Sequence, residues 1–256
     1  MGTVEQSPAR EASLEALIET ELLKVESLHP GGLELTEELA ELCGVRSGSD
    51  VLELACGTGE SACFLAERRG ARVVGLDGSP RMIRRAEQKA RASRLQVEFR
   101  EADAHHLPFP DAAFDVAICE CTLCLLEKEQ VIREMVRVVR PGGCVGMHDL
   151  WWREDTPDDL KRTLAEIEGE RPETLEGWKR LFARAGLDEI RAVDKSSLIP
   201  RWMKESREQL GRMGQLALVW KVTRRWGFRG LRRILRSERA FSSAQLGYGI
   251  VLGSRR

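Results

Sequence analysis

The sequence has few of the features that mark membrane-spanning, secreted or disordered proteins. No apolar run approaches the roughly 20 residues that a membrane-spanning helix needs. Residues 1–15 are polar and acidic, unlike a signal peptide. Aromatic residues make up only 5% of the chain, yet 42% of it is hydrophobic, which is enough to bury a sizeable core. We therefore expect a globular, cytoplasmic protein.

Internal repeats and low-complexity tracts are also missing, so the 256 residues suit one domain or one domain with an appended subdomain. Cysteine is the one unusual residue type. There are seven, an odd number, and three of them stand together at positions 119, 121 and 124. This pattern fits reduced thiols better than a disulfide framework.

Residues 51–60 organise the chain, because a short apolar run there breaks into a Gly-x-Gly turn and then into a helical pattern. Gly57 and Gly59 can adopt positive φ and lack a Cβ, so the backbone can approach a ligand at the carboxyl end of the strand. No Gly-Lys-Ser/Thr follows, which excludes a phosphate-binding P-loop. Ala62 fits the third position of the looser dinucleotide fingerprint, so a nicotinamide or flavin cofactor stays open.

A second apolar run ends in Asp77, 18 residues beyond Gly59, where doubly wound folds place a ribose-binding carboxylate. Apolar patterns predict strands at 51–55, 72–77, 95–100, 114–119, 143–149, 188–194 and 247–253. They predict helices at 11–27 (ended by His29-Pro30-Gly31-Gly32), 34–43, 60–69, 80–92, 127–139, before Gly169, and at 174–185. This alternation implies βαβ units and a parallel sheet.

Five ordered segments resemble the class I S-adenosylmethionine-dependent methyltransferases: residues 53–59, Asp77, and residues 102–104, 114–118 and 138–143. The resemblance runs from about residue 30 to 150 and continues weakly to the end. It implies an α/β fold with a doubly wound, seven-stranded, mostly parallel, Rossmann-like sheet and a helical lid insertion. Glu53 departs from the family's more common Asp but keeps the charge.

The resemblance also implies S-adenosyl-L-methionine as the cofactor. Gly57 and Gly59 would let the backbone lie along its methionine part. Asp77 would accept both ribose hydroxyls, Asp103 would accept from the adenine amine, and Met82 would pack on the adenine. The residues expected at the cofactor are Glu53, Ala55, Gly57, Gly59, Asp77, Gly78, Met82, Asp103, Ala104 and Glu120. Asp77 and Asp103 could instead be turn residues.

We expect four parts: N-terminal helices at 1–48, a cofactor-binding core at 49–196, a basic helical insertion at 197–243 and the last core strand at 244–256. In open α/β sheets the ligand lies beyond the carboxyl ends of the parallel strands. The insertion and residues 150–173 both emerge from that edge, so we expect them to roof the pocket of the methyl acceptor. The alternative is a peripheral decoration of the sheet edge.

Cys119, Cys121 and Cys124 lie at the carboxyl end of the expected fourth strand. The segment resembles arsenite methyltransferases, which carry Cys-x-Leu-x-Leu in this loop, although the further downstream cysteines of that family are missing here. Thiolates are nucleophiles and ligands for soft ions, so Cys119 and Cys121 are candidate catalytic residues. Together with Cys124 and Cys144 they could hold a soft ion. A structural zinc site and simple burial as small apolar side chains are the alternatives.

His148 is the candidate catalytic base, since it ends the expected fifth strand and Asp149 follows it. An alternative for His148 is an oriented hydrogen-bonding role. His105 and His106 precede a loop that the family carries near the adenine, and we expect them to be structural.

Net charge is −1, but residues 199–240 carry twelve Lys or Arg against three Glu, a net +9. Three interpretations stay open: a helical lid whose arginines pair with the acidic residues 154–173, attraction of an anionic substrate, or a basic interfacial helix that contacts a membrane surface. A sequence pI near 6.5 argues against nucleic-acid binding.

Together these features predict an S-adenosylmethionine-dependent methyltransferase that acts on a small-molecule acceptor. The leading acceptor is soft, a metalloid such as arsenite or a thiol. One alternative is C- or O-methylation of a quinone-like or other hydrophobic molecule, with His148 assisting. Another is a cofactor-binding protein without catalysis. A dehydrogenase fits the glycine spacing but does not explain residues 102–104 and 140–143. The oligomeric state stays open.

Overall fold

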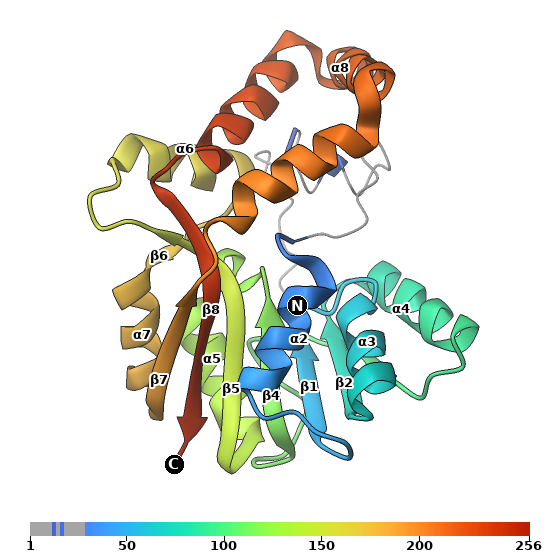
Figure 1. Ribbon diagram of the computed structural model, residues 1–256, viewed down its shortest axis with the longest axis vertical. Coiled ribbons are helices and arrows are strands. Elements are labelled where there is room, and N and C mark those ends of the chain that lie inside the picture. Colours follow the sequence, from blue (N-terminus) through green and yellow to red (C-terminus); the bar gives the residue numbers. More distant parts are fainter. Residues whose placement is uncertain (1–11, 14–15, 18–28) are drawn as a thin grey trace.

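The computed structural model describes residues 12–13, 16–17 and 29–256, and a single sheet forms its centre (Figure 1). Its strands are β1 Asp50–Leu54, β2 Arg72–Asp77, β3 Glu98–Glu101, β4 Phe114–Glu120, β5 Val139–Trp152, β6 Glu173–Thr174, β7 Leu187–Asp194 and β8 Leu246–Arg255. Their order is β3-β2-β1-β4-β5-β8-β7, with the short β6 paired to β5 off this path. Strands β1 to β5 run parallel, whereas β8 is antiparallel to β5 and β7. The predicted α/β fold is confirmed.

Helices lie on both faces of the sheet (Figure 1). They are α2 Gly32–Leu42, α3 Glu60–Arg69, α4 Pro80–Ala92, α5 Lys128–Val138, α6 Asp158–Glu168, α7 Leu175–Arg184 and α8 Leu198–Phe241, with a short 3-10 turn, η2 Leu123–Leu125. Two clusters of buried apolar residues fill the two faces. Along β4, Val116 and Ile118 belong to one cluster and Ala117 and Cys119 to the other, as the period-two alternation of a strand requires.

The order of the strands reverses between β1 and β4. From β1 the chain crosses to β2 and β3 on one side, and it returns to β4 and β5 on the other. Such a reversal opens a crevice outside the carboxyl ends of the two central strands, where doubly wound folds bind their ligands. The crevice here therefore lies between the glycine loop after β1 and the end of β4.

The bounds of α3, β2 and α4 are those predicted, whereas β3, β5 and β8 differ from the prediction and the short β6 was not predicted. β5 extends beyond the predicted residues 143–149, because the antiparallel β8 pairs with it from Cys144 to Trp152. β3 begins only at Glu98. The helix predicted at 11–27 falls mostly outside the described residues.

α6 and α8 lie above the carboxyl edge of the sheet (Figure 1). α8 bends at Gly211 and Gly227, where φ is 59° and 65°, values that glycine adopts without a Cβ clash. The bends divide α8 into three helical segments, 198–210, 212–226 and 228–241. Among the described residues, no helix is both long and apolar enough to cross a membrane.

The third segment of α8 packs on α6. Arg233 Nη2 donates to the carbonyl oxygen of Glu166 at 3.1 Å, and Arg236 Nη2 donates to Thr163 Oγ1 at 3.1 Å. Basic residues of the insertion thus contact the acidic residues 154–173. In these two hydrogen bonds the acceptor is a carbonyl or a hydroxyl oxygen rather than a carboxylate.

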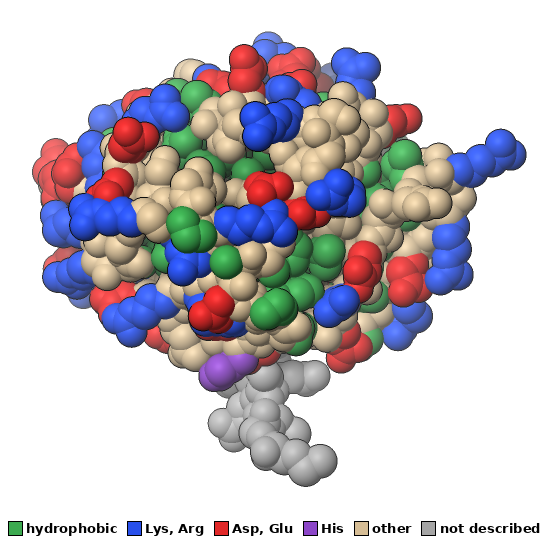
Figure 2. All heavy atoms as spheres, turned by 90° about the horizontal axis from the view of Figure 1, so that it is seen from below, with side chains coloured by type: hydrophobic (Ala, Val, Ile, Leu, Met, Phe, Trp, Pro, Cys, Tyr) green, Lys and Arg blue, Asp and Glu red, His purple; other side chains and the backbone are tan. Residues whose placement is uncertain are grey.

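The opposite end of the molecule, at the amino ends of the parallel strands, carries interspersed basic and acidic side chains (Figure 2). Arg140 Nη1 donates there to Asp50 Oδ2 at 3.0 Å and to Asp115 Oδ1 at 2.6 Å. These ion pairs join the starts of β1, β4 and β5, and they lie far from the ligand edge.

Candidate active site

The loop between β1 and α3 forms a cradle for a ligand. Ala55, Gly57 and Gly59 all have positive φ, at 54°, 52° and 72°. A Cβ on Gly57 would meet nothing within 4 Å, so open space faces this residue. A Cβ on Gly59 would lie 2.7 Å from the ring of Phe99, so Gly59 is required for packing as well as for the turn. The backbone around Gly57 therefore fits a cofactor that lies directly on it.

Asp77 connects this loop to the end of β2. Its Oδ2 accepts the Gly57 N–H at 2.9 Å, and its Oδ1 accepts the Ser79 N–H at 2.8 Å. Gly78 follows it, and Met82 lies in the first turn of α4. The carboxylate thus sits at the loop where the resemblance places the ribose hydroxyls.

Asp103 lies beyond the end of β3, before Ala104, and 61% of its side chain is exposed. Its Oδ1 accepts the backbone N–H of His105 at 2.9 Å and lies 2.6 Å from His105 Nδ1. The His105 N–H is the main cause that lowers the pKa of Asp103. His105 Nε2 accepts the Glu127 N–H at 3.2 Å, so Nδ1 carries the proton and donates to Asp103. His105 thereby positions Asp103, which agrees with the structural role expected for it.

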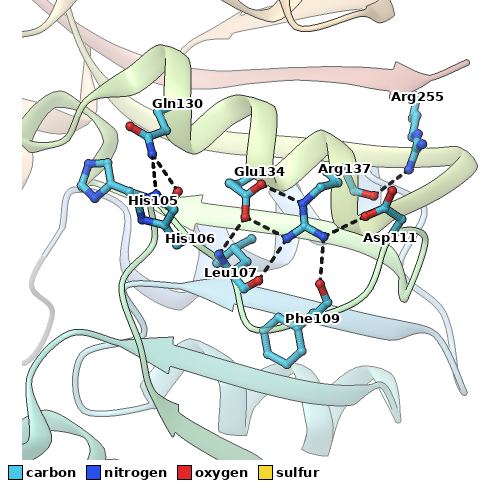
Figure 3. A network of polar contacts seen from close by, with 9 residues as sticks. All are labelled: His105, His106, Leu107, Phe109, Asp111, Gln130, Glu134, Arg137 and Arg255. Atoms are coloured by element: carbon cyan, nitrogen blue, oxygen red, sulfur yellow. Dashed lines mark hydrogen bonds and ion pairs between the residues drawn. The ribbon is translucent and has the colours of Figure 1, made fainter.

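One arginine supports the loop that follows Asp103 (Figure 3). Arg137 on α5 donates to the carbonyl oxygens of Leu107 and Phe109 at 3.0 and 2.8 Å. It also donates to Asp111 Oδ1 at 2.9 Å and to Glu134 Oε2 at 2.8 Å. The guanidinium therefore holds residues 107–111 against α5.

The carboxyl end of β4 carries a buried group of ionisable side chains. Glu120 Oε1 lies 3.2 Å from His148 Nε2 on β5, and Glu120 Oε2 lies 3.5 Å from His29 Nε2. Ser61 Oγ donates to Glu120 Oε2 at 2.6 Å, and Tyr248 OH lies 2.7 Å from His148 Nδ1. We call His29, Glu120 and His148 the His–Glu cluster.

Burial and neighbouring charges set the protonation of this region. Burial, aided by His148, lowers the pKa of His29 to about 4. Burial also raises the pKa of Glu53, on β1, and nearby Glu120 adds to the effect. For Glu120 burial opposes ionisation, but His148, His29 and Ser61 outweigh it, so its pKa falls below the ordinary value. Glu120 is thus a carboxylate, and Glu53 favours its protonated form.

A cavity of about 380 Å³ opens next to the cluster. Its lining includes His29, Gly31 before α2, Glu60 at the start of α3 and Trp202 on α8. His29 was not expected at the site, because the sequence around it indicated only a helix end. His148, the expected base, is completely buried and does not line this cavity. Its catalytic role stays a prediction.

A second cavity, of about 270 Å³, lies inside the insertion. All three segments of α8 line it, mainly with apolar side chains such as Leu218, Val222 and Ile234. Trp202 and Ser206 line both cavities. The cavity beside the cluster, which is the more polar of the two, therefore adjoins a mainly apolar one within the insertion.

The structure does not bring the four candidate cysteines together. Cys119 belongs to the apolar cluster on one face of the sheet, whereas Cys144 lies on the other face beside Cys43. Burial raises the pKa of Cys119 and Cys124 well above the ordinary value. Among the described residues, the cysteines form no group of three with converging sulfur atoms. The expected soft-ion site of Cys119, Cys121, Cys124 and Cys144 is therefore not formed.

The remaining predicted cofactor residues do share one edge. Glu53 and Ala55 lie at the end of β1, Asp77 ends β2, Asp103 follows β3 and Glu120 ends β4. Parallel neighbours end at the same edge of a sheet. Direct contact of each with a cofactor stays a prediction.

Comparison with known proteins supports a methyltransferase domain. A family model described as a methyltransferase domain matches residues 51–143. Methyltransferase GfsG of Streptomyces halstedii is 34% identical over 180 residues, which cover 67% of this chain and 64% of that protein. Demethylmenaquinone methyltransferase of Thermus thermophilus is 48% identical over 95 residues, which cover 36% of this chain and 43% of that protein. The chain thus spans less than two thirds of the length of both relatives.

Among solved structures, that of the cyclase SpnF is similar with a TM-score of 0.71 and 26% identity, over 91% of this chain and 85% of that one. From the matched domain, the relatives and the fold, we conclude that the chain contains a methyltransferase domain of the class I type, which uses S-adenosyl-L-methionine.

Proposed function

We propose that the protein transfers a methyl group from S-adenosyl-L-methionine to a carbon or oxygen atom of a hydrophobic small molecule. The observation that carries this proposal is the pair of adjoining cavities. The cavity beside His29 suits a polar reacting end, and the cavity under α8 suits an apolar body. An acceptor that spans both would pass Trp202 and Ser206, which line the two.

The residues present fit the cofactor. Open space at Gly57 would admit its methionine part, Asp77 would accept its ribose hydroxyls, and Asp103 would accept from its adenine. When bound, S-adenosyl-L-methionine supplies an electrophilic methyl group on a positively charged sulfur. The protein then has to hold the acceptor atom close and in line, and to keep water out of the site.

Residues at the end of β4 and the start of α2 would act on the acceptor. His29 lines the cavity, and its lowered pKa of about 4 keeps the imidazole neutral near pH 7. Glu120 and His148 lie behind it and hold its orientation. An imidazole with so low a pKa is a weak base, so His29 would orient the acceptor through a hydrogen bond rather than remove its proton.

The comparisons favour this acceptor class over a soft one. The relative from Thermus thermophilus is named for demethylmenaquinone, a hydrophobic quinone. The cysteines that a soft acceptor would need do not converge. For this reason the acceptor that we propose is quinone-like or otherwise hydrophobic.

The surface of α8 supports an acceptor that partitions into lipid. Leu216 and Trp220 are 65% and 59% exposed, and the guanidinium of Arg224 lies 5.1 Å from the Trp220 ring centroid. Exposed apolar and aromatic side chains among basic ones suit contact with an anionic membrane surface. Co-sedimentation with anionic lipid vesicles tests this part, and equal sedimentation of Trp220→Ser and the wild-type protein would contradict it.

A second candidate follows from the similarity to the cyclase SpnF, over 91% of this chain. The same scaffold could hold a hydrophobic molecule for a rearrangement, with the cofactor bound but not consumed. The two candidates differ in the mass of the product, because methylation adds a methyl group and a cyclisation leaves the mass unchanged.

The role of the apolar cavity is tested with a matched pair of variants on one helical segment. Leu218→Asn places an amide in that cavity, whereas Met213→Asn changes an exposed residue of the same segment that does not line it. We expect Leu218→Asn to lower kcat/KM about tenfold for acceptors with long apolar parts, with unchanged cofactor affinity. Equal kcat/KM in the two variants would overturn the assignment.

A further inference from the structure

The His–Glu cluster has the composition of a metal-binding site. One ligand atom from each of His29, Glu120 and His148 lies within 4.8 Å of the other two. Within the part of the chain that the structure describes, this is the one group of three or more His, Cys, Asp and Glu side chains with that property. Two imidazoles and one carboxylate are donors that divalent transition metals such as zinc and iron accept.

Distances within the cluster match those between ligands of one ion. Two atoms bonded to a metal at about 2.1 Å, with a tetrahedral angle between the bonds, lie roughly 3.4 Å apart. His148 Nε2 lies 3.2 Å from Glu120 Oε1, and His29 Nε2 lies 3.5 Å from Glu120 Oε2. These distances run to the two different oxygens of Glu120, and one ligand atom of each residue lies within 4.8 Å of the other two, so the side chains would share an ion after adjusting their positions.

Two polar atoms in the cluster are buried without a hydrogen-bond partner. Glu120 Oε1 and His148 Nε2 lie 3.2 Å apart, within ion-pair distance, and neither meets hydrogen-bond geometry with a described atom. Buried polar atoms in native proteins are nearly always satisfied. A cation between them would satisfy both.

Contacts around the cluster resemble those that orient metal ligands. Tyr248 OH lies 2.7 Å from His148 Nδ1, which leaves Nε2 directed at Glu120. Ser61 Oγ donates to Glu120 Oε2 at 2.6 Å, and His29 Nδ1 lies 3.4 Å from the carbonyl oxygen of the next residue. Metal-binding histidines commonly use their other ring nitrogen in this way.

We propose that His29, Glu120 and His148 bind one divalent transition-metal ion. The ion would fasten the start of α2 to the ends of β4 and β5, three segments that are distant in the sequence. His29 also lines the 380 Å³ cavity, so the proposed metal site adjoins the space that we assign to the acceptor. Binding of the ion can be measured without cofactor or acceptor, so this inference and the proposed methyl transfer can fail independently.

Metal binding to the full chain tests the proposal. The protein is treated with a chelator, its fold is checked by circular dichroism, and it is titrated with Co²⁺, whose visible absorption reports the ligands. Zinc content is measured by mass spectrometry after gel filtration. We expect one ion per chain, and at least tenfold weaker binding in His29→Asn and Glu120→Gln. His106→Asn is the control, because 79% of its side chain is exposed and it lies outside the cluster.

Three results would overturn the proposal: no bound ion in the wild-type protein, equal affinity in His29→Asn, or a sulfur-to-cobalt charge-transfer band that shows cysteine ligands. Glu120→Gln could disturb the core, so Zn²⁺ is also added during thermal unfolding. We expect Zn²⁺ to raise the Tm of the wild type and of His106→Asn, but not that of His29→Asn.

Discussion

At the residue scale, the cofactor cradle depends on a carboxylate that two backbone groups already hold. Asp77 accepts the Gly57 N–H with one oxygen and the Ser79 N–H with the other, at 2.9 and 2.8 Å. A carboxylate offers about four lone-pair positions, so both oxygens can still accept ribose hydroxyls. Asp77 is therefore preorganised at the junction of the glycine loop and β2.

Asp77→Ala should weaken binding of S-adenosyl-L-methionine by about ten- to a hundredfold, since hydrogen bonds to a charged group contribute roughly 1.5–3 kcal/mol. Isothermal titration calorimetry measures the change. Asp158→Ala removes a carboxylate from α6 whose side chain is 82% exposed, and it should leave the affinity unchanged. Equal affinity in the two variants would remove Asp77 from the cofactor site.

Arg137→Met should destabilise the protein by about 1–3 kcal/mol, because the loop carbonyls of Leu107 and Phe109 lose their donor. Denaturation in urea measures the free energy of unfolding. Arg133→Met is the matched control on the same helix: its exposed i,i+4 pair with Glu129 should contribute less than about 0.5 kcal/mol. A similar loss in both variants would mean that Arg137 does not support the loop.

The interaction between Arg137 and Glu134 predicts that the stability of the fold depends on pH. The hydrogen bond from Arg137 is the main cause that lowers the pKa of Glu134 below its usual 4.5. A carboxyl whose pKa is lower in the folded than in the unfolded chain stabilises the fold at pH values above its unfolded pKa. This contribution is lost as the pH falls through the folded pKa. The stability difference between wild type and Arg137→Met should therefore shrink below about pH 4.5. A difference that grows on acidification would contradict the assignment.

His29 shows which part of the site could not be predicted from the sequence. Its run with proline and two glycines indicates the end of a helix, and nothing local connects it to β4 or β5. Only the fold brings it to Glu120 and His148. By contrast, Asp77 stands at a fixed spacing after the glycine loop, so its place was predictable. The position of Cys144 relative to Cys119 was not predictable, because the sequence did not show that the two residues face opposite sides of the sheet.

At the scale of elements, local signals account for the bounds that were predicted correctly. α4 begins at Pro80 because Ser79 caps it, accepting the Met82 N–H at 3.4 Å. Strand β5 was predicted too short, since its length depends on the pairing with β8 at the far end of the chain. The insertion was expected to be helical, but its two bends follow from glycines that the helical pattern around them obscures.

Gly211→Ala and Gly227→Ala should each lower the free energy of unfolding by about 1–3 kcal/mol. The φ and ψ values are 59° and 171° at Gly211 and 65° and −168° at Gly227, and both pairs are accessible essentially to glycine alone. We expect several-fold lower kcat/KM for the acceptor, with unchanged cofactor affinity, since the bends shape the apolar cavity. Gly214→Ala is the control: this glycine has no positive φ, and an added Cβ would have only ordinary contacts. Equal Tm and kcat/KM in all three variants would show that the bends are not needed.

At the scale of the whole molecule, the sheet and the lid have separate tasks. The ends of β1, β2 and β3 carry the residues assigned to the cofactor, whereas residues of α2 and α8 line the space assigned to the acceptor. The family model covers residues 51–143, which hold the cofactor part and exclude the insertion. The cofactor part is thus predictable from the sequence, whereas the lid to which we assign the acceptor is less so.

The most direct test of methyl transfer to a hydrophobic acceptor follows a deuterated methyl group from S-adenosyl-L-methionine. The protein is incubated with the labelled cofactor and a panel of demethylated quinones, other hydrophobic hydroxyl compounds, arsenite and a small thiol, and the products are analysed by mass spectrometry. We predict that the label appears on a carbon or oxygen of a hydrophobic compound. Label on arsenite or the thiol, or a rearranged product of unchanged mass with intact cofactor, would contradict the account.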